Sequence, residues 1–559
     1  MQSVAKNDQM ELSITAMSSE GAGIGRVDGM AVFVPGTAVG DTAFVRVIKV
    51  NRNYAVGKLL TLLEPSDSRV EPDCSVFPRC GGCVYRHISY AEECRIKQVK
   101  VADALRRIGG VELESEPILA SAQIDSYRNK AQYPVGRSPE GDTIIGFYAA
   151  RSHRIVNNRC CRLQPPEFDA ALAAFSGWMK DCAVEPYEEA TGRGVVRHLY
   201  LRSAPATGQQ MACVVTATEK LSHADELCRR LRRQVPGICS ILHNVHPDRT
   251  NLVLGKRFIT LWGEEAIEDA LCGMRVRISP RSFYQVNSPQ AERLYRKAAE
   301  LAALRPDDVL LDLYCGTGTI GLSMASQVSR VIGVEVVPDA VEDARRNALA
   351  NDIHNAEFFC MDAAQAAESL ARQGLHPDVV LLDPPRKGCS GELVEIVAQS
   401  MAPDRVVYVS CDPATLARDL ACFVEQGYTP IRAVPVDLFP RTAHVESIVL
   451  LSHKSPDSVI NVKVEFGEGE GKVPLGAIAE RAKKYQPKPK ITYRMIQEYV
   501  EKNYGFKVHT AYIAEVKRSL GLTRYDAFNV AEQLKQPRKH PPKEKVEAIK
   551  DALKHFEVI

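Results

Sequence analysis

The sequence lacks the features of a membrane, secreted or strongly charged protein. No stretch of the 559 residues approaches about 18 uninterrupted apolar residues, which excludes a membrane-spanning helix. The first residues, MQSVAKNDQMELSI, contain no basic segment leading into an apolar run, so we expect no signal peptide and a cytoplasmic protein. Neither charge sign dominates, because 71 basic side chains face 69 acidic ones. The net charge of the whole chain therefore gives no indication of a nucleic-acid partner.

The composition is that of a globular protein whose charge is unevenly distributed. Hydrophobic residues make up 45% and charged residues 25%, and the length allows three or four domains. Residues 454–559 contain 21 Lys and Arg against 14 Asp and Glu, a net charge of +7, which leaves −5 for the first 453 residues. A basic tail after a mildly acidic body favours a polyanionic partner.

Patterning along the chain predicts four regions. Residues 1–64 contain short alternating strands with turns between them, such as MAVFVPG and TAFVRVIKV, which are typical of a small OB-like β-barrel. Residues 65–272 mix helices and strands and predict an α+β domain. In residues 273–452 apolar strands alternate with helices, as in an α/β doubly wound parallel sheet. Residues 453–559 predict a basic, mainly helical extension to which the sequence assigns no role.

A glycine-rich turn in the third region favours a nucleoside-bearing ligand. In DLYCGTGTIGL, Tyr314, Gly316 and Gly318 lie between a strand and a helix, and Glu335 ends the next strand. Such a carboxylate can accept hydrogen bonds from ribose hydroxyls. The turn lacks the full G-x-G-x-x-G spacing, so a methyl donor without pyrophosphate fits better than NAD.

Three motifs at predicted strand ends carry reactive side chains. Asp383 begins the motif DPPRKG, where Arg386 stands in place of the aromatic residue usual in amine methylases. Cys411 ends a strand in VSCDP, at a position where nucleophiles are presented. Glu446 precedes the strand SIVLL and is a candidate general base, although a lone glutamate there is more often solvated.

The cysteines form a further motif. Cys74, Cys80 and Cys83 are closely spaced, and Cys160 and Cys161 follow far downstream. Three near cysteines and a remote fourth fit an iron–sulfur cluster or a structural zinc ion. The spacing is not the C-x3-C-x2-C of radical enzymes.

Together these residues resemble the RNA uracil-5-methyltransferase family that modifies 23S rRNA and tRNA. The motifs DLYCGTGTIGL, LLDPPRKG, YVSCDPATLARDL and FPRTAHVES occur in family order, and RSFYQVN precedes them. The resemblance covers residues 10–452 and implies a Rossmann-like class I methyltransferase domain, a TRAM barrel at the N-terminus and a central iron–sulfur domain. It does not extend to the residues after 452.

The resemblance also implies roles for individual residues. Cys411 would be the nucleophile and Glu446 the base. S-adenosylmethionine would be bound by Gln285, Tyr314, Glu335 and Asp383, with Asp362 and Thr319 nearby. A 4Fe-4S cluster would be held by Cys74, Cys80, Cys83 and Cys161. Asp412 departs from the family pattern, which usually has Asn after the nucleophile.

The expected reaction is methylation of C5 of a uridine in 23S rRNA, with a tRNA uridine as the alternative. The expected partner is RNA rather than DNA or a membrane, and we expect a monomer. Two other classes stay open at this point. Cytosine-C5 methylation also uses a cysteine nucleophile, although its usual Pro-Cys or Thr-Cys setting differs from Ser-Cys-Asp-Pro. A non-catalytic RNA-binding protein would not need both Cys411 and Glu446.

Overall fold

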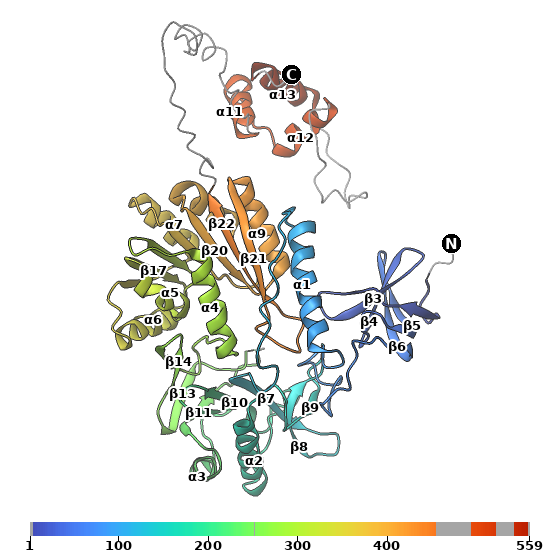
Figure 1. Cartoon of the computed structure of the whole chain (residues 1–559), viewed down its shortest axis with the longest axis vertical. Coiled ribbons are helices and arrows are strands. Elements are labelled where there is room, and N and C mark those ends of the chain that lie inside the picture. The colour runs from blue at the N-terminus through green and yellow to red at the C-terminus, as the bar shows by residue number, and fades with distance from the viewer. Residues whose placement is uncertain (1–3, 251, 454–492, 521–540, 557–559) are drawn as a thin grey trace, which may run out of the picture. The chain divides into compact units, whose positions relative to one another are not determined.

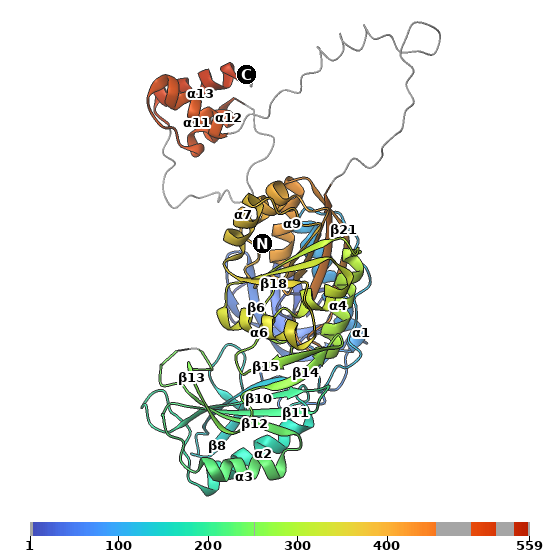
Figure 2. The same cartoon turned by 90° about the vertical axis from the view of Figure 1, so that its left-hand side faces the viewer.

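The computed structural model describes residues 4–250, 252–453, 493–520 and 541–556. The chain divides into two compact units, residues 1–457 and residues 458–559. The larger unit contains three sheets of six or seven strands and a separate hairpin (Figures 1 and 2).

The first sheet forms the N-terminal barrel. Its strands lie in the order β1-β5-β6-β4-β3-β2, and alternate side chains, such as Val32 and Val34 or Val45 and Val47, fill its core. This period of two is what a strand with one buried face requires. The strands are β1 (Gln9–Ser13), β2 (Ala16–Met17), β3 (Ala22–Val27), β4 (Met30–Pro35), β5 (Thr42–Val50) and β6 (Tyr54–Glu64).

The second sheet lies in the middle of the sequence, in the order β13-β12-β11-β10-β7-β8-β9. One face packs on two helices through Leu199 and Leu201, and alternate residues such as Tyr200 belong to a core that the separate hairpin and the third sheet, both described below, also line. The elements are β7 (Lys130–Arg137), β8 (Thr143–Tyr148), β9 (Ile155–Asn157), α2 (Pro166–Asp181), β10 (Val196–Ala204), β11 (Gln209–Thr216), α3 (Ala224–Gln234), β12 (Ile238–Val245) and β13 (Arg257–Gly263).

The third sheet is doubly wound, with strand order β18-β17-β16-β19-β20-β22-β21 and helices on both faces (Figure 1). Apolar runs such as VVLL are buried on both sides, as a covered parallel sheet requires. The strands are β16 (Val309–Leu313), β17 (Arg330–Glu335), β18 (Ala356–Cys360), β19 (Val379–Leu382), β20 (Arg405–Ser410), β21 (Tyr428–Val436) and β22 (Glu446–His453).

A hairpin of β14 (Ile267–Leu271) and β15 (Met274–Ile278) precedes the third sheet, and helices alternate with the strands of that sheet along the chain. The helices of this region are α4 (Ser288–Ala302), α5 (Thr319–Met324), the short η1 (Ala325–Gln327), α6 (Pro338–Ala350), α7 (Ala363–Arg372), α8 (Gly391–Glu395), η2 (Ile396–Met401) and α9 (Pro413–Glu425). Helix α1 (Tyr90–Arg107) also packs here, because Val101 and Leu105 belong to the same core.

The smaller unit contains three described helices around a core of its own. They are α11 (Tyr493–Tyr504), α12 (Thr510–Ser519) and α13 (Lys543–His555). Ile496, Val500, Ile513 and Ile549 are buried together. Residues 487–490, PKPK, have the proline-rich composition typical of a linker and lie outside the described residues.

Candidate active site

Three of the predicted residues follow the carboxyl ends of neighbouring parallel strands. Strand β16 pairs with β17 on one side and with β19 on the other, so the strand order reverses between β16 and β19. Tyr314 follows β16, Glu335 ends β17 and Asp383 follows β19. In open α/β sheets ligands bind at the strand ends where the order reverses. The fold therefore places these three residues at the expected ligand position.

Strand register also brings Cys411 next to Glu446, which is 35 residues later in the sequence. Strand β22 runs antiparallel to β20, with Ser410 opposite Ser447. Continuing this register by one residue places Cys411 opposite Glu446. Parallel pairing of β19 with β20 brings Asp383 to the same edge. The thiol and two carboxyl groups therefore belong to one cluster, which we call the reactive cluster: Cys411, Glu446 and Asp383.

The acidic groups of the reactive cluster have raised pKa values, because few positive charges offset the loss of contact with water. Burial raises the pKa of Glu446 to about 8, and the negative charge of Asp383 adds to the rise. Burial also raises the pKa of Asp383 to about 7. Burial and both carboxyl groups raise the pKa of the Cys411 thiol to about 11. Perturbed carboxyl groups of this kind are typical of sites that move protons.

Arg386 is the cation that opposes these shifts. Its charge lowers the pKa of both Cys411 and Glu446, although its own side chain is exposed. Among the described residues, neither Asp383 nor Glu446 forms an ion pair. In the sequence, Arg386 stands out only by replacing the aromatic residue usual in amine methylases, and that pattern predicts no electrostatic role. Its position after Asp383-Pro-Pro was the available signal.

The glycine-rich turn has the backbone geometry of a ligand-binding loop. Tyr314 adopts a left-handed conformation with φ of 70°, which is strained for a residue with a side chain. Glu335 accepts hydrogen bonds from the backbone N–H groups of Gly316, at 3.2 Å, and Val337, at 2.9 Å. These two hydrogen bonds hold the backbone of the glycine-rich turn against the Glu335 carboxylate.

The remaining predicted ligand residues lie around this turn. Thr319 is the first residue of α5, and its hydroxyl lies 3.3 Å from the hydroxyl of Tyr295. Asp362 is exposed and caps α7 by accepting a hydrogen bond from the N–H of Ala364, at 3.0 Å. The backbone carbonyl of Gln285 accepts a hydrogen bond from the Asn129 side chain at 2.8 Å.

Asp412 has a structural role that explains its side chain. It is the N-cap of α9, where one carboxylate oxygen accepts hydrogen bonds from the N–H groups of Ala414 and Thr415, at 3.0 and 2.9 Å. Asp and Asn are both favoured at this position because either side chain can satisfy these otherwise unpaired donors. Replacement of the usual Asn therefore leaves the start of the helix intact.

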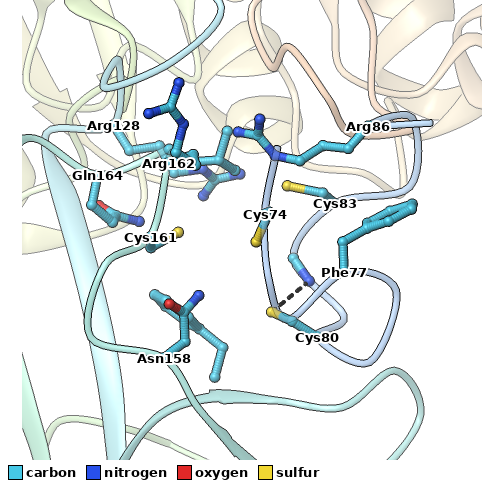
Figure 3. A pocket seen from close by; sticks show the side chains of 13 residues that line it. Cys74, Phe77, Cys80, Cys83, Arg86, Arg128, Asn158, Cys161, Arg162 and Gln164 are labelled. Atoms are coloured by element: carbon cyan, nitrogen blue, oxygen red, sulfur yellow. Dashed lines mark hydrogen bonds between the residues drawn. The ribbon is translucent and has the colours of Figure 1, made fainter. Parts of the chain in front are cut away.

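The four predicted cysteine ligands line one pocket. Cys74, Cys80 and Cys83 come from a single loop and Cys161 from a distant segment, with their sulfur atoms directed toward a shared space (Figure 3). The cavity has a volume of about 110 Å³. Cys160 is exposed and does not line it.

These four thiols are half-buried, and several arginines line the same pocket. Burial raises the pKa of Cys83 to about 12 and also raises the pKa values of Cys80 and Cys161. Arg86 is buried and pairs with Asp73 and Asp125, both at 2.6 Å. Within the described part of the chain, no three His, Cys, Asp or Glu side chains are arranged to hold a single metal ion. The four thiols thus line one pocket, but their spacing does not match the ligand set of a single metal ion.

Comparison with known proteins places this geometry in a family. Residues 224–454 match the family model described as tRNA (Uracil-5-)-methyltransferase, and residues 5–60 match the TRAM domain. An uncharacterized RNA methyltransferase of Clostridium tetani is 44% identical over 450 residues, which are 80% of this chain and 97% of that protein. Another, from Halalkalibacterium halodurans, is 42% identical over 453 residues, covering 81% and 98% of the two chains.

A solved structure extends the match to three dimensions. Pyrococcus abyssi tRNA (uracil-54, C5)-methyltransferase, in complex with S-adenosyl-L-homocysteine, has a TM-score of 0.65 and 27% identity over 79% of this chain and 100% of that one. The fold is thus an N-terminal TRAM domain joined to a class I methyltransferase domain, as predicted. The chain belongs to the RNA uracil-5-methyltransferase family, and S-adenosylmethionine is its methyl donor. No described helix is long and apolar enough to cross a membrane.

Proposed function

We propose that the protein methylates C5 of a uridine in 23S rRNA through a covalent adduct with Cys411. After the thiol has given its proton to solvent, the sulfur bonds to C6 of uracil and electron density moves to C5. The electron pair at C5 then bonds to the methyl group of S-adenosylmethionine, whose bond between sulfur and that methyl breaks to leave S-adenosylhomocysteine. Glu446 then accepts the C5 proton, and the bond between C6 and sulfur breaks to release the product.

The observation that carries this proposal is the strand register that sets Cys411 opposite Glu446. The reaction needs one thiol and one proton acceptor on the same base. Glu446 has a raised pKa and no ion-pair partner among the described residues, so it suits the acceptor role. A thiol at the end of a strand, only half-buried, can reach a base that has left its stack.

The methyl donor would be bound at the glycine-rich turn that follows β16. Glu335, already aligned by two backbone N–H groups, is suited to ribose hydroxyls. The proposed set of contacts is Gln285, Tyr314, Glu335 and Asp383, with Thr319 and Asp362 at its edge.

The choice of 23S rRNA rests on the resemblance of the barrel and the cysteine motif to the rRNA branch of the family. A tRNA uridine is the second candidate, because the Pyrococcus abyssi protein that matches 79% of this chain is a tRNA (uracil-54, C5)-methyltransferase. The test is methyl transfer from labelled donor to unmodified 23S rRNA and, separately, to unmodified tRNA. Labelling of 23S rRNA alone is expected, and labelling of tRNA alone would reverse the choice.

We also propose that Cys74, Cys80, Cys83 and Cys161 hold a 4Fe-4S cluster. A zinc ion needs four ligands about 2.3 Å from one centre, whereas a cluster of four irons holds its thiolates farther apart. Four thiols around one cavity, without a set fit for a single ion among the described residues, match the wider arrangement. Anaerobically purified protein should contain about four irons per chain, and stoichiometric zinc without iron would refute the cluster.

A further inference from the structure

A second cavity lies between the middle sheet and the segment that leads to Gln285. It has a volume of about 640 Å³, and its lining includes four cationic side chains and no acidic one. Lys130 comes from β7 and Arg202 from β10, while Lys256 and Arg281 lie on the opposite segments. An exposed aromatic ring, Phe283, also lines it. This cationic cavity is distinct from the reactive cluster.

Arg202 is the most unusual of these side chains. It is only 2% exposed, and its two terminal nitrogens donate to the carbonyl oxygens of Ser279, at 2.9 Å, and Ser282, at 2.7 Å. Its Nε has no partner, and the side chain forms no ion pair with a described acid. Burying a charge without a counter-charge costs free energy unless a ligand supplies one.

The neighbouring cations add to this unbalanced charge. Burial and the positive charges of Arg202 and Arg128 lower the pKa of Lys130 to about 8. Neither Lys130 nor Lys256 forms an ion pair within the described ranges. Arg281 is the exception, because it pairs with Asp339 at 3.3 Å, whereas Asp343 accepts a hydrogen bond from Ser282.

Hydrogen bonds join this cavity to the active site. Asn129, next to Lys130, donates through its side chain to the carbonyl of Gln285 at 2.8 Å and accepts from the N–H of Ser203 at 2.9 Å. Asn287 donates to the carbonyl of Leu438, in the segment that leads to Glu446, at 3.1 Å. A ligand in the cavity would therefore lie beside the segments that position the methyl donor and the base.

We propose that this cavity binds a backbone phosphodiester of the substrate RNA close to the target uridine, with Lys130 and Lys256 as the phosphate contacts and the buried Arg202 adding positive charge to the cavity wall. The inference rests on the proposed function and names a contact for its substrate. The cavity is open and larger than one phosphate ion, so it fits a phosphate that belongs to a chain. Arginine and lysine at such a site fix the register of the RNA without reading its sequence.

The test measures RNA binding without turnover. In the full chain carrying Cys411→Ala, Lys130→Gln and Lys256→Gln are combined, and the dissociation constant for a uridine-containing single-stranded RNA of about 20 nucleotides is followed against KCl. Each lost phosphate contact on a single strand should make the slope of log affinity against log salt shallower by about 0.7. We expect a change of about 1.4 for the double variant and a roughly tenfold weaker affinity at about 0.1 M salt.

Lys180→Gln is the matched control, because Lys180 is an exposed lysine on α2 outside the cavity lining. It should leave slope and affinity unchanged, and all variants should bind S-adenosyl-L-homocysteine as the parent does. An unchanged slope in the double variant, or an equal change in Lys180→Gln, would overturn the proposal. Millimolar binding of inorganic phosphate that is lost in the double variant without a change in RNA slope would assign the cavity to a free anion instead.

The same data separate this proposal from the proposed function. Because the Cys411→Ala parent performs no chemistry, its RNA binding does not depend on which base is methylated. A shallower slope together with a wild-type chain that methylates neither rRNA nor tRNA would retain the cavity and reject the function. Methylation of RNA by the wild-type chain together with an unchanged salt slope would retain the proposed function and reject the cavity.

Discussion

Two groups of charged side chains lie near the two ends of the loop between β21 and β22, residues 437–445, and they differ in whether an opposite charge is paired with them. At its start, Lys97 donates to Glu93 and Asp437, both at 2.7 Å, and all three side chains are completely buried. Tyr90 donates to Asp437 at 2.8 Å, and the N–H of Arg441 donates to Glu93 at 2.6 Å. At its end, Glu446 and Asp383 have no ion-pair partner among the described residues.

The difference separates charges that hold the fold from charges that act. The Lys97 network ties α1 to the loop that carries Glu446, and each of its charged groups meets an opposite charge. In the reactive cluster, no ion pair offsets the loss of water around the two carboxyl groups. Their pKa values are therefore raised, and they can take up protons near neutral pH. A paired charge would be more stable but a poorer proton acceptor.

The largest expected effect is on chemistry in the reactive cluster. Cys411→Ala should reduce methyl transfer by about a thousandfold or more, because no other group there can form the adduct. Binding of S-adenosyl-L-homocysteine, measured by calorimetry, should stay within about twofold, since the thiol acts on the base. Cys422→Ala, on the neighbouring α9, is the control and should retain activity. Turnover by Cys411→Ala at the normal rate would assign the nucleophile elsewhere.

The next effect concerns stability at the Lys97 network. Lys97→Met should lower the free energy of unfolding by about 3–5 kcal/mol, because it leaves two carboxylates buried without their cation. Arg106→Ala on the same helix removes an exposed pair with Asp103 and should cost less than about 1 kcal/mol. Urea unfolding of the two variants tests this. Equal losses would show that the network is no more than a surface pair.

A smaller change in the free energy of unfolding, an increase instead of a loss, is expected when Glu446 is replaced. Its pKa is about 8 in the folded chain against an ordinary 4.5, so between these values the folded state binds more protons than the unfolded one. Stability should therefore fall as pH rises from about 4.5 to 8. Glu446→Gln removes this penalty and should stabilise the ligand-free protein at pH 8 by on the order of 2 kcal/mol. At pH 4.5 the variant and the parent should be alike, and a loss of stability at pH 8 would contradict the sign.

The smallest effect concerns the C-terminal extension. The two family models match residues 5–60 and 224–454, and the Clostridium tetani protein matches 450 residues of this chain over 97% of its own length, so the extension is additional to the shared enzyme. Truncation after Ser452 should retain catalysis on a short stem-loop. Affinity for long rRNA should fall and its salt slope become shallower, because residues 454–559 carry a net charge of +7. An unchanged slope with unchanged affinity would remove RNA contact as the role of this extension.

The sequence predicted the reactive residues better than the groups around them. Tyr314, Asp383 and Cys411 each follow an apolar strand, so their meeting at one edge follows from a parallel sheet. The spacing of Glu93 and Lys97 is that of an ordinary exposed helix pair, and nothing local shows that Asp437, 340 residues away, buries it. The cavity around Arg202 also depends on segments far apart in the chain, and no motif marks it.

The central claim is that Cys411 and Glu446 act in sequence on one uridine. Its most direct test is Glu446→Gln incubated with S-adenosylmethionine and unmodified RNA, followed by nuclease digestion and mass spectrometry. The account predicts a stable protein–RNA adduct that carries a methylated uridine on the peptide containing Cys411, with slow release of product. Turnover at the wild-type rate with no trapped adduct would contradict it, because proton removal would then belong to another residue.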